Sequence, residues 1–223
     1  MKAVKAKYRK LFFLVLLLIF TLAAAGCTRF DPAQYVMSTL DFNFKGEVEQ
    51  YAKIVDKSAD TLQKEYDQMM EWTDVENFKT FFDIDSTSDE TNALVISFYK
   101  ELFAKADYKA SGTEKTEDGY EVTVKVAPLD IFYQSYEDIN AFVAEFNENN
   151  KNFAYADLAD YEYEDVYARG VLDVLKNHLD SVGYLKERTF TVRIQKDHNS
   201  YSINAEDFDA VCEAVVAYEV PDE

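Results

Sequence analysis

Cysteine and positive charge are both scarce in this chain of 223 residues. It has two cysteines, Cys27 and Cys212, and 23 basic residues against 42 acidic ones, which gives a formal net charge of −19 at pH 7. If Cys27 is modified, Cys212 has no partner within the chain, so no intramolecular disulfide framework is expected. An acidic surface repels phosphate groups, so we expect no nucleic-acid partner.

Sequence signatures of catalysis are also missing from residues 27–223. The patterns GxSxG, HExxH, GxxxxGK[ST], CxxC and GxGxxG are all absent. His178 and His198 are the two histidines, and neither has a cysteine or serine at a spacing that indicates a catalytic pair. We therefore assign no catalytic residue, no cofactor and no metal ligand, and we favour a protein that is not an enzyme.

The longest apolar run is too short for a stable membrane span. It covers residues 11–26, or 16 residues, whereas roughly 18–20 are needed to cross a bilayer as a helix. Five basic residues and no acid precede it, and small residues end it. This pattern is typical of a signal peptide, which we predict to cover residues 1–26.

The run ends in Ala24, Ala25, Gly26 and Cys27, which resembles the lipobox of bacterial lipoproteins, although Ala24 stands where leucine is commonest. The resemblance implies cleavage between Gly26 and Cys27 and lipidation of Cys27, by palmitate among other acyl chains. The lipid would anchor the chain to the cell membrane on its extracytoplasmic face. Loss of the leader removes five basic residues and changes the formal net charge to −24. The alternative is secretion without an anchor, with Cys27 as an unmodified free thiol.

The rest of the chain has the pattern of one folded unit. We predict a lipidated tether over residues 27–31 and a single α+β domain over residues 32–223, with residues 32–127 and 128–223 as two weakly similar halves as an alternative. Asp31 and Pro32 indicate a helix start. A joint between two helical pieces is expected near Gly46, a helix begins at Ser58, and residues 74–85 form a weaker segment. A capping box over residues 87–90 begins the next helix. Later helices are predicted over residues 130–146 and 162–182, and Asn204 caps the last one.

Two hairpins are predicted where the hydrophobic period changes from about 3.6 residues to 2. The first covers residues 108–127, with a turn ending at Gly119, and places Tyr108, Ala110 and Gly112 on the same face as Val122, Val124 and Val126. The second covers residues 190–203. Together they predict an antiparallel sheet of about four strands with helices packed on it.

Two acidic stretches are candidates for binding. In DIDSTSDETNAL, Asp83, Asp85, Thr87 and Asp89 have the spacing of a calcium loop, but Ser88 and Leu94 stand where glycine and glutamate are required. We therefore favour a polar connection that caps the next helix. DLADYEYEDVY, residues 157–167, interleaves carboxylates with tyrosines and could bind sugars or cationic peptides. We favour the other interpretation, a solvated helix start whose acids complement the helix dipole. Cys212 is expected to be a buried apolar side chain.

Several segments together resemble a group of small lipoproteins of Gram-positive gut bacteria that are assigned to domains of unknown function. The resemblance rests on the lipobox cysteine, on FKGEVEQYAKIVDKSADTLQKEYDQMM and on EDGYEVTVKVAPLDIF. It implies an extracytoplasmic location and a cystatin-like or NTF2-like α+β fold, in which helices pack on a curved sheet. Cys27 is the one site residue that it carries to this chain.

Two functions remain open from the sequence. The first is a lipid-anchored, non-enzymatic binding or accessory module that presents its domain, through the concave face of the sheet, to an envelope protein or a small ligand. The second is an envelope hydrolase that cleaves glycan or peptide with a carboxylate pair; the acid- and tyrosine-rich residues 157–167 motivate it, but the sequence does not identify the pair. A subunit of a larger envelope complex is a third alternative, expected to expose a large apolar patch.

Overall fold

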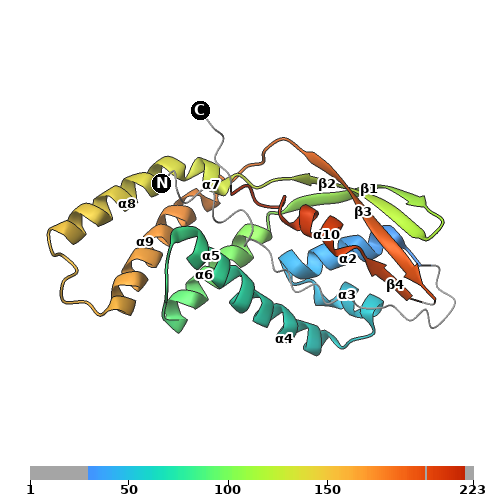
Figure 1. Cartoon of the computed structure of the whole chain (residues 1–223), viewed down its shortest axis with the longest axis horizontal. Helices are drawn as coiled ribbons and strands as arrows, with labels where there is room; N and C mark the ends of the chain where they lie inside the picture. Colours follow the sequence, from blue (N-terminus) through green and yellow to red (C-terminus); the bar gives the residue numbers. More distant parts are fainter. Residues whose placement is uncertain (1–29, 199, 219–223) are drawn as a thin grey trace.

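The computed structural model describes residues 30–198 and 200–218 (Figure 1). The predicted signal peptide, the cleavage site at Gly26 and the lipidation site at Cys27 lie outside these residues. Among the helices of the described ranges, none combines the length and the apolar character needed to cross a bilayer.

The described chain has an α+β fold, as predicted. Its elements are, in order, α2 (Pro32–Lys45), α3 (Val48–Val55), α4 (Ala59–Met69), the π-helix η2 (Met70–Asp74), α5 (Val75–Phe82), α6 (Asp89–Phe103), β1 (Asp107–Lys115), β2 (Gly119–Ala127), α7 (Ile131–Gln134), α8 (Tyr136–Lys151), α9 (Asp160–Leu179), β3 (Arg188–Asp197), β4 (Ser200–Ile203) and α10 (Ala205–Cys212).

Both predicted hairpins are confirmed, and they share one antiparallel sheet with the strand order β1-β2-β3-β4. The two hairpins are joined where β2 pairs with β3, for example through Val122 and Val192. Helices α7, α8 and α9 are therefore an insertion between two neighbouring strands. In Figure 1, α8 and α9 project at one end of the molecule, and the turns of the sheet lie at the other end.

The register of the first hairpin differs from the prediction at one residue. Tyr108 and Ala110 pair with Val126 and Val124, as expected, but the register then shifts and Gly112 pairs with Thr123. A β-bulge inserts an extra residue into one strand and so reverses the face on which the following side chains lie. The prediction that Gly112 shares the face of the valines is therefore wrong.

One face of the sheet belongs to the hydrophobic core. Its buried side chains are Tyr108, Val122, Val124, Val126, Val192, Ile194 and Ile203. Helix α2 packs on β1 and β2, and α10 packs on β3, so packed side chains close this face. The opposite face is polar, and there Glu187 forms ion pairs with Lys125 at 2.8 Å and with Lys109 at 3.2 Å.

The helical segments follow the prediction with four differences. The weaker segment over residues 74–85 contains the well-formed helix α5. The cap of α6 is Ser88, whose hydroxyl oxygen accepts from the backbone N–H of Thr91, one residue later than predicted. The helix predicted over residues 130–146 is divided at Ser135 into α7 and α8 and continues to residue 151. The helix predicted over residues 162–182 is α9, which ends three residues earlier, at residue 179.

Candidate functional site

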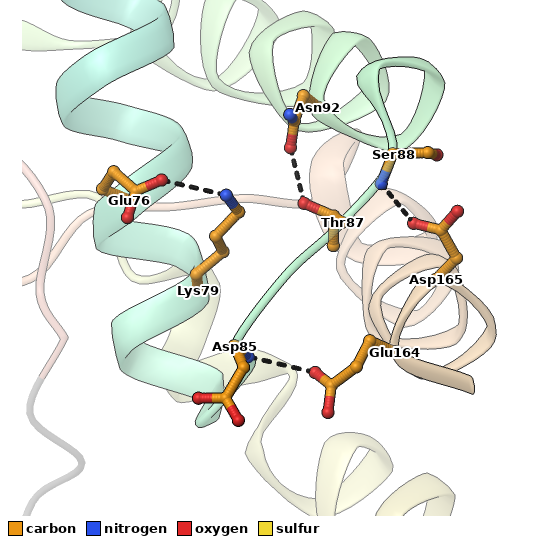
Figure 2. Close-up of polar contacts among 8 residues, drawn as sticks. All are labelled: Glu76, Lys79, Asp85, Thr87, Ser88, Asn92, Glu164 and Asp165. Carbon is orange, nitrogen blue, oxygen red and sulfur yellow. Dashed lines mark hydrogen bonds and ion pairs between the residues drawn. The ribbon is translucent and has the colours of Figure 1, made fainter. Parts of the chain in front are cut away.

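The two acidic stretches singled out in the sequence meet in the structure (Figure 2). The connection from α5 to α6 runs beside the first half of α9. The backbone N–H of Asp85 donates to Oε2 of Glu164 at 3.1 Å, and the backbone N–H of Ser88 donates to Oδ1 of Asp165 at 2.8 Å. Arg169, one turn further along α9, donates from Nε to Oγ1 of Thr91 at 3.0 Å. These contacts join residues almost 80 positions apart in the chain.

The two neighbouring carboxylates have pKa values shifted in opposite directions. Burial raises the pKa of Glu164, and the negative charges of Asp85 and Asp83 add to the increase. Burial also acts to raise the pKa of Asp165, but hydrogen bonds from Ser88 and the positive charge of Arg169 outweigh it and lower that pKa. Both carboxylates thus accept hydrogen bonds that hold a loop in place.

The calcium-loop residues do not converge on one point. Asp83 adopts a left-handed conformation at the end of α5, with φ of 59°, and the hydroxyl of Thr87 donates to Oδ1 of Asn92 at 2.6 Å. Among residues 30–198 and 200–218, no group of three or more His, Cys, Asp or Glu side chains is placed to hold a metal ion. The α5–α6 connection instead caps α6 through Ser88, which agrees with the prediction of a polar connection that caps the next helix.

The tyrosines of residues 157–167 are divided between the helix interface and the surface. Tyr163 and Tyr167 lie 5.1 Å, centroid to centroid, from the ring of Phe146 on α8. Tyr161 is 55% exposed and stands at the tip where α8 turns into α9. The same tip exposes Phe153, 79% accessible with a φ of 62°, and Leu158. A bulky residue in the left-handed region is strained, and such strain concentrates at functional sites.

A small cavity lies where several helices meet the segment that follows α10. It is lined by Asn43, Phe44, Met69, Thr73, Asp74, Phe103, Cys212, Val216 and Tyr218. Its volume of about 30 Å³ suits roughly two water molecules and is far below the roughly 300–1,000 Å³ of ligand pockets. Cys212 is buried there, as predicted, and burial raises the pKa of its thiol.

Asp74 is the ionisable group of this cavity that the sequence interpretation missed. It ends the π-helix η2 and is 9% exposed. Burial raises its pKa to about 8, so the carboxyl group is protonated at neutral pH. A π-turn in a longer helix is rare and often lies near a functional site. A sequence signal for the burial of Asp74 does exist. Asp74 lies four residues from Met70 and four from Phe78, so in a helix it shares a face with these two apolar side chains, which are buried in the structure.

The two histidines lie apart from this cavity and from the junction of the acidic stretches. Nε2 of His178 in α9 lies 2.7 Å from Oδ2 of Asp138 in α8, and this contact connects the two helices. Nδ1 of His198 lies 2.6 Å from Oδ1 of Asp197 in the β3–β4 turn. Among residues 30–198 and 200–218, each histidine contacts one carboxylate, and both contacts are at the surface.

The first described residue is docked on the sheet. The ring of Phe30 stacks on that of Tyr201 in β4 with 3.8 Å between centroids and 1° between planes. It also lies 5.7 Å from the ring of Tyr120 in β2 and 5.9 Å from that of Tyr35 in α2. Asp31 follows at once and caps α2, accepting from the backbone N–H of Gln34 at 3.0 Å. The chain is therefore held from residue 30 onward.

Comparison with known proteins gives one similarity, in fold. The sequence matches no protein-family model, and no curated protein matches it at a significant level. Among solved structures, the chain is similar to a crystal structure from Bacillus subtilis subsp. subtilis str. 168 of a protein described as a candidate lipoprotein, YcdA, with a TM-score of 0.52 and 15% identity. The match covers 83% of this chain and 56% of that one, so this chain spans little more than half of the other's length. At this identity the likeness concerns the fold alone.

Proposed function

We propose that this chain is a lipid-anchored, extracytoplasmic lipoprotein that acts as a non-enzymatic binding or accessory module. Removal of residues 1–26 would leave Cys27 as the lipidated first residue, anchored in the cell membrane. The Ala-Ala-Gly-Cys sequence supports the anchor, and so does the description of the Bacillus subtilis structure of similar fold as a candidate lipoprotein.

The observation that carries the binding role is the exposed tip between α8 and α9, which we call the α8–α9 tip and define as residues 151–161. It presents Phe153, Leu158 and Tyr161 to solvent at the end of a projecting helix pair (Figure 1). Exposed aromatic side chains on a rigid support are typical of the residues that contribute most to protein–protein binding. The partner is therefore proposed to be another protein of the envelope.

The hydrolase alternative has weaker support. The acids of residues 157–167 that motivated it include Glu164 and Asp165, and both accept hydrogen bonds from backbone N–H groups of the α5–α6 connection. Of the cavity-lining residues, Asp74 is the one carboxylate, whereas hydrolysis of a glycosidic bond generally uses a pair.

The anchor and the tip can be tested with the same cells. The full-length protein is crosslinked in the membrane and recovered beside three variants: Cys27→Ala, Phe153→Ser combined with Tyr161→Ser, and the control Tyr133→Ser. Tyr133 is also exposed, at 46%, but lies on α7 away from the tip. Mass spectrometry of the amino-terminal peptide reports lipidation directly.

We expect a defined partner with the unaltered protein and with Tyr133→Ser, and its loss with the tip variant. Cys27→Ala should remain unlipidated and leave the membrane fraction. Equal recovery of every crosslinked protein with the tip variant and with the control would contradict the binding role. An unmodified Cys27 thiol would contradict the anchor.

A further inference from the structure

Docking of Phe30 places the sheet close to the proposed anchor. Two residues, Thr28 and Arg29, separate Phe30 from Cys27. Three peptide steps can span at most about 11 Å even in a fully extended chain. A lipid on Cys27 would therefore hold the ring stack of Phe30, Tyr120 and Tyr201 within roughly that distance of the membrane interface.

This ring stack lies near the turns of both hairpins. Tyr120 follows the first residue of β2, and Tyr201 follows the first residue of β4. The two turns lie side by side, because the backbone N–H of Lys196 donates to the carbonyl oxygen of Asp118 at 2.8 Å. Residues close to the tether thus belong to one end of the molecule, the end that holds both turns in Figure 1.

The α8–α9 tip lies at the opposite end. Helix α8 has 16 residues and α9 has 20, which correspond to lengths of about 24 and 30 Å. Figure 1 shows both helices running away from the sheet, with the connection between them farthest from the hairpin turns.

We propose that the docking of Phe30 on Tyr120 and Tyr201 sets the orientation of the domain on the membrane. The β1–β2 and β3–β4 turns face the lipid surface, and the α8–α9 tip faces away from it, toward partners. The inference rests on the proposed lipidation of Cys27. It assigns the aromatic stack a positioning role that a plain flexible tether does not have.

Electrostatic attraction does not supply this orientation. The exposed residues of the two turns include Glu117, Asp118 and Asp197 against Lys115 and Lys196, so this end has no excess of positive charge to attract anionic headgroups. The orientation should therefore be the same on neutral vesicles and insensitive to salt, because a short covalent tether and a ring stack maintain it.

The experiment uses the full-length lipidated protein in phosphatidylcholine vesicles that contain an acceptor dye on the headgroup of a minor lipid. A donor dye is attached either to Asp118→Cys, in the β1–β2 turn, or to Asp157→Cys, in the α8–α9 tip. Both positions are exposed, and Cys212 is buried and so protected from the label. Energy transfer is measured on the vesicle-bound fraction alone.

We expect transfer from position 118 to exceed transfer from position 157 by about twofold or more, since α8 alone separates the two ends by about 24 Å. Phe30→Ser should reduce the difference, and Phe30→Tyr should preserve it. A second variant inserts 16 Gly/Ser residues between Thr28 and Arg29; its linker spans about 20–24 Å on average and leaves the docked ring in place. This variant should abolish the difference between the two positions, without any effect on folding.

Equal transfer from the two positions in the unaltered protein would overturn the proposal. A difference that survives the inserted linker would do the same, because orientation would then not depend on the short tether. Failure of the proposed anchor gives another result: the protein would not float with the vesicles, and its amino-terminal peptide would carry no lipid.

Discussion

Replacement of Asp74 by asparagine should remove a pH dependence of folding stability that a single buried carboxyl group creates. In the folded chain burial raises the pKa of Asp74 from its ordinary value of 3.8 to about 8. The unfolded chain, with the lower pKa, releases this proton first. The contribution of Asp74 to the free energy of unfolding is therefore largest below pH 4, decreases as the pH rises from 4 to 8, and changes no further above pH 8.

The magnitude follows from the size of the shift. A pKa difference of roughly four units corresponds to about 6 kcal/mol across the whole window, or about 1.4 kcal/mol for each pH unit. Between pH 5 and pH 7 the contribution of Asp74 should decrease by about 3 kcal/mol. An asparagine of the same shape does not ionise, so Asp74→Asn should be more stable than the unaltered protein at pH 7, by an amount that shrinks toward pH 5.

The assay is urea unfolding followed by far-UV circular dichroism at pH 5, 6, 7 and 8. The quantity of interest is the difference in unfolding free energy between Asp74→Asn and the unaltered protein, because contributions from other acids cancel in that difference. Glu71→Gln is the matched control, since Glu71 lies in the same π-helix but is exposed. A difference for Asp74→Asn that does not change between pH 5 and pH 8 would refute the reasoning.

Two further predictions concern single positions in the sheet and in the loop. Gly119→Ala should destabilise the fold by about 3 kcal/mol, because an added Cβ would overlap the carbonyl oxygen of Ile194. Gly112→Ala should be tolerated, since the atom nearest to its added Cβ is 3.7 Å away. Equal unfolding midpoints of the two variants in urea would contradict this. Asp165→Ala should cost about 1–2 kcal/mol and expose the amide of Ser88 to hydrogen exchange, and an unchanged exchange rate at that amide would show that the bond does not hold the loop.

Local sequence patterns predicted the hairpins because their physical causes are local. Alternation of valine with polar residues along β2 identifies a strand with one buried face, and Gly119, with a φ of 155°, occupies the position where its turn requires glycine. Asn204 caps the last helix for a similar reason, since the atoms that it bonds lie three residues away. Such short-range preferences need no knowledge of the rest of the chain.

The candidate site could be predicted less well from the sequence, because the residues that form it are distant from one another along the chain. The acidic stretches around Asp85 and Glu164 were both noticed, but nothing in the sequence showed that they bond each other. Asp74 looked like an acid in a weak segment, and its burial depends on α2, α6 and α10 packing around the π-turn. The bulge before Gly112 has one local signal, a glycine inside a strand pattern, but this signal does not by itself fix the register of the pairing.

The sequence by itself determined the predicted export and anchor signal, the strongly acidic surface and the kind of most regular elements, although not the π-helix η2 or helix α5. Composition, a leader and periodicity are properties of neighbouring residues. Tertiary structure alone decided that both hairpins share one sheet, that α8 and α9 project from it, and that Phe30 is docked on Tyr201. These features arise from contacts between segments brought together by folding, whose energy is gained only after the chain between them has been ordered.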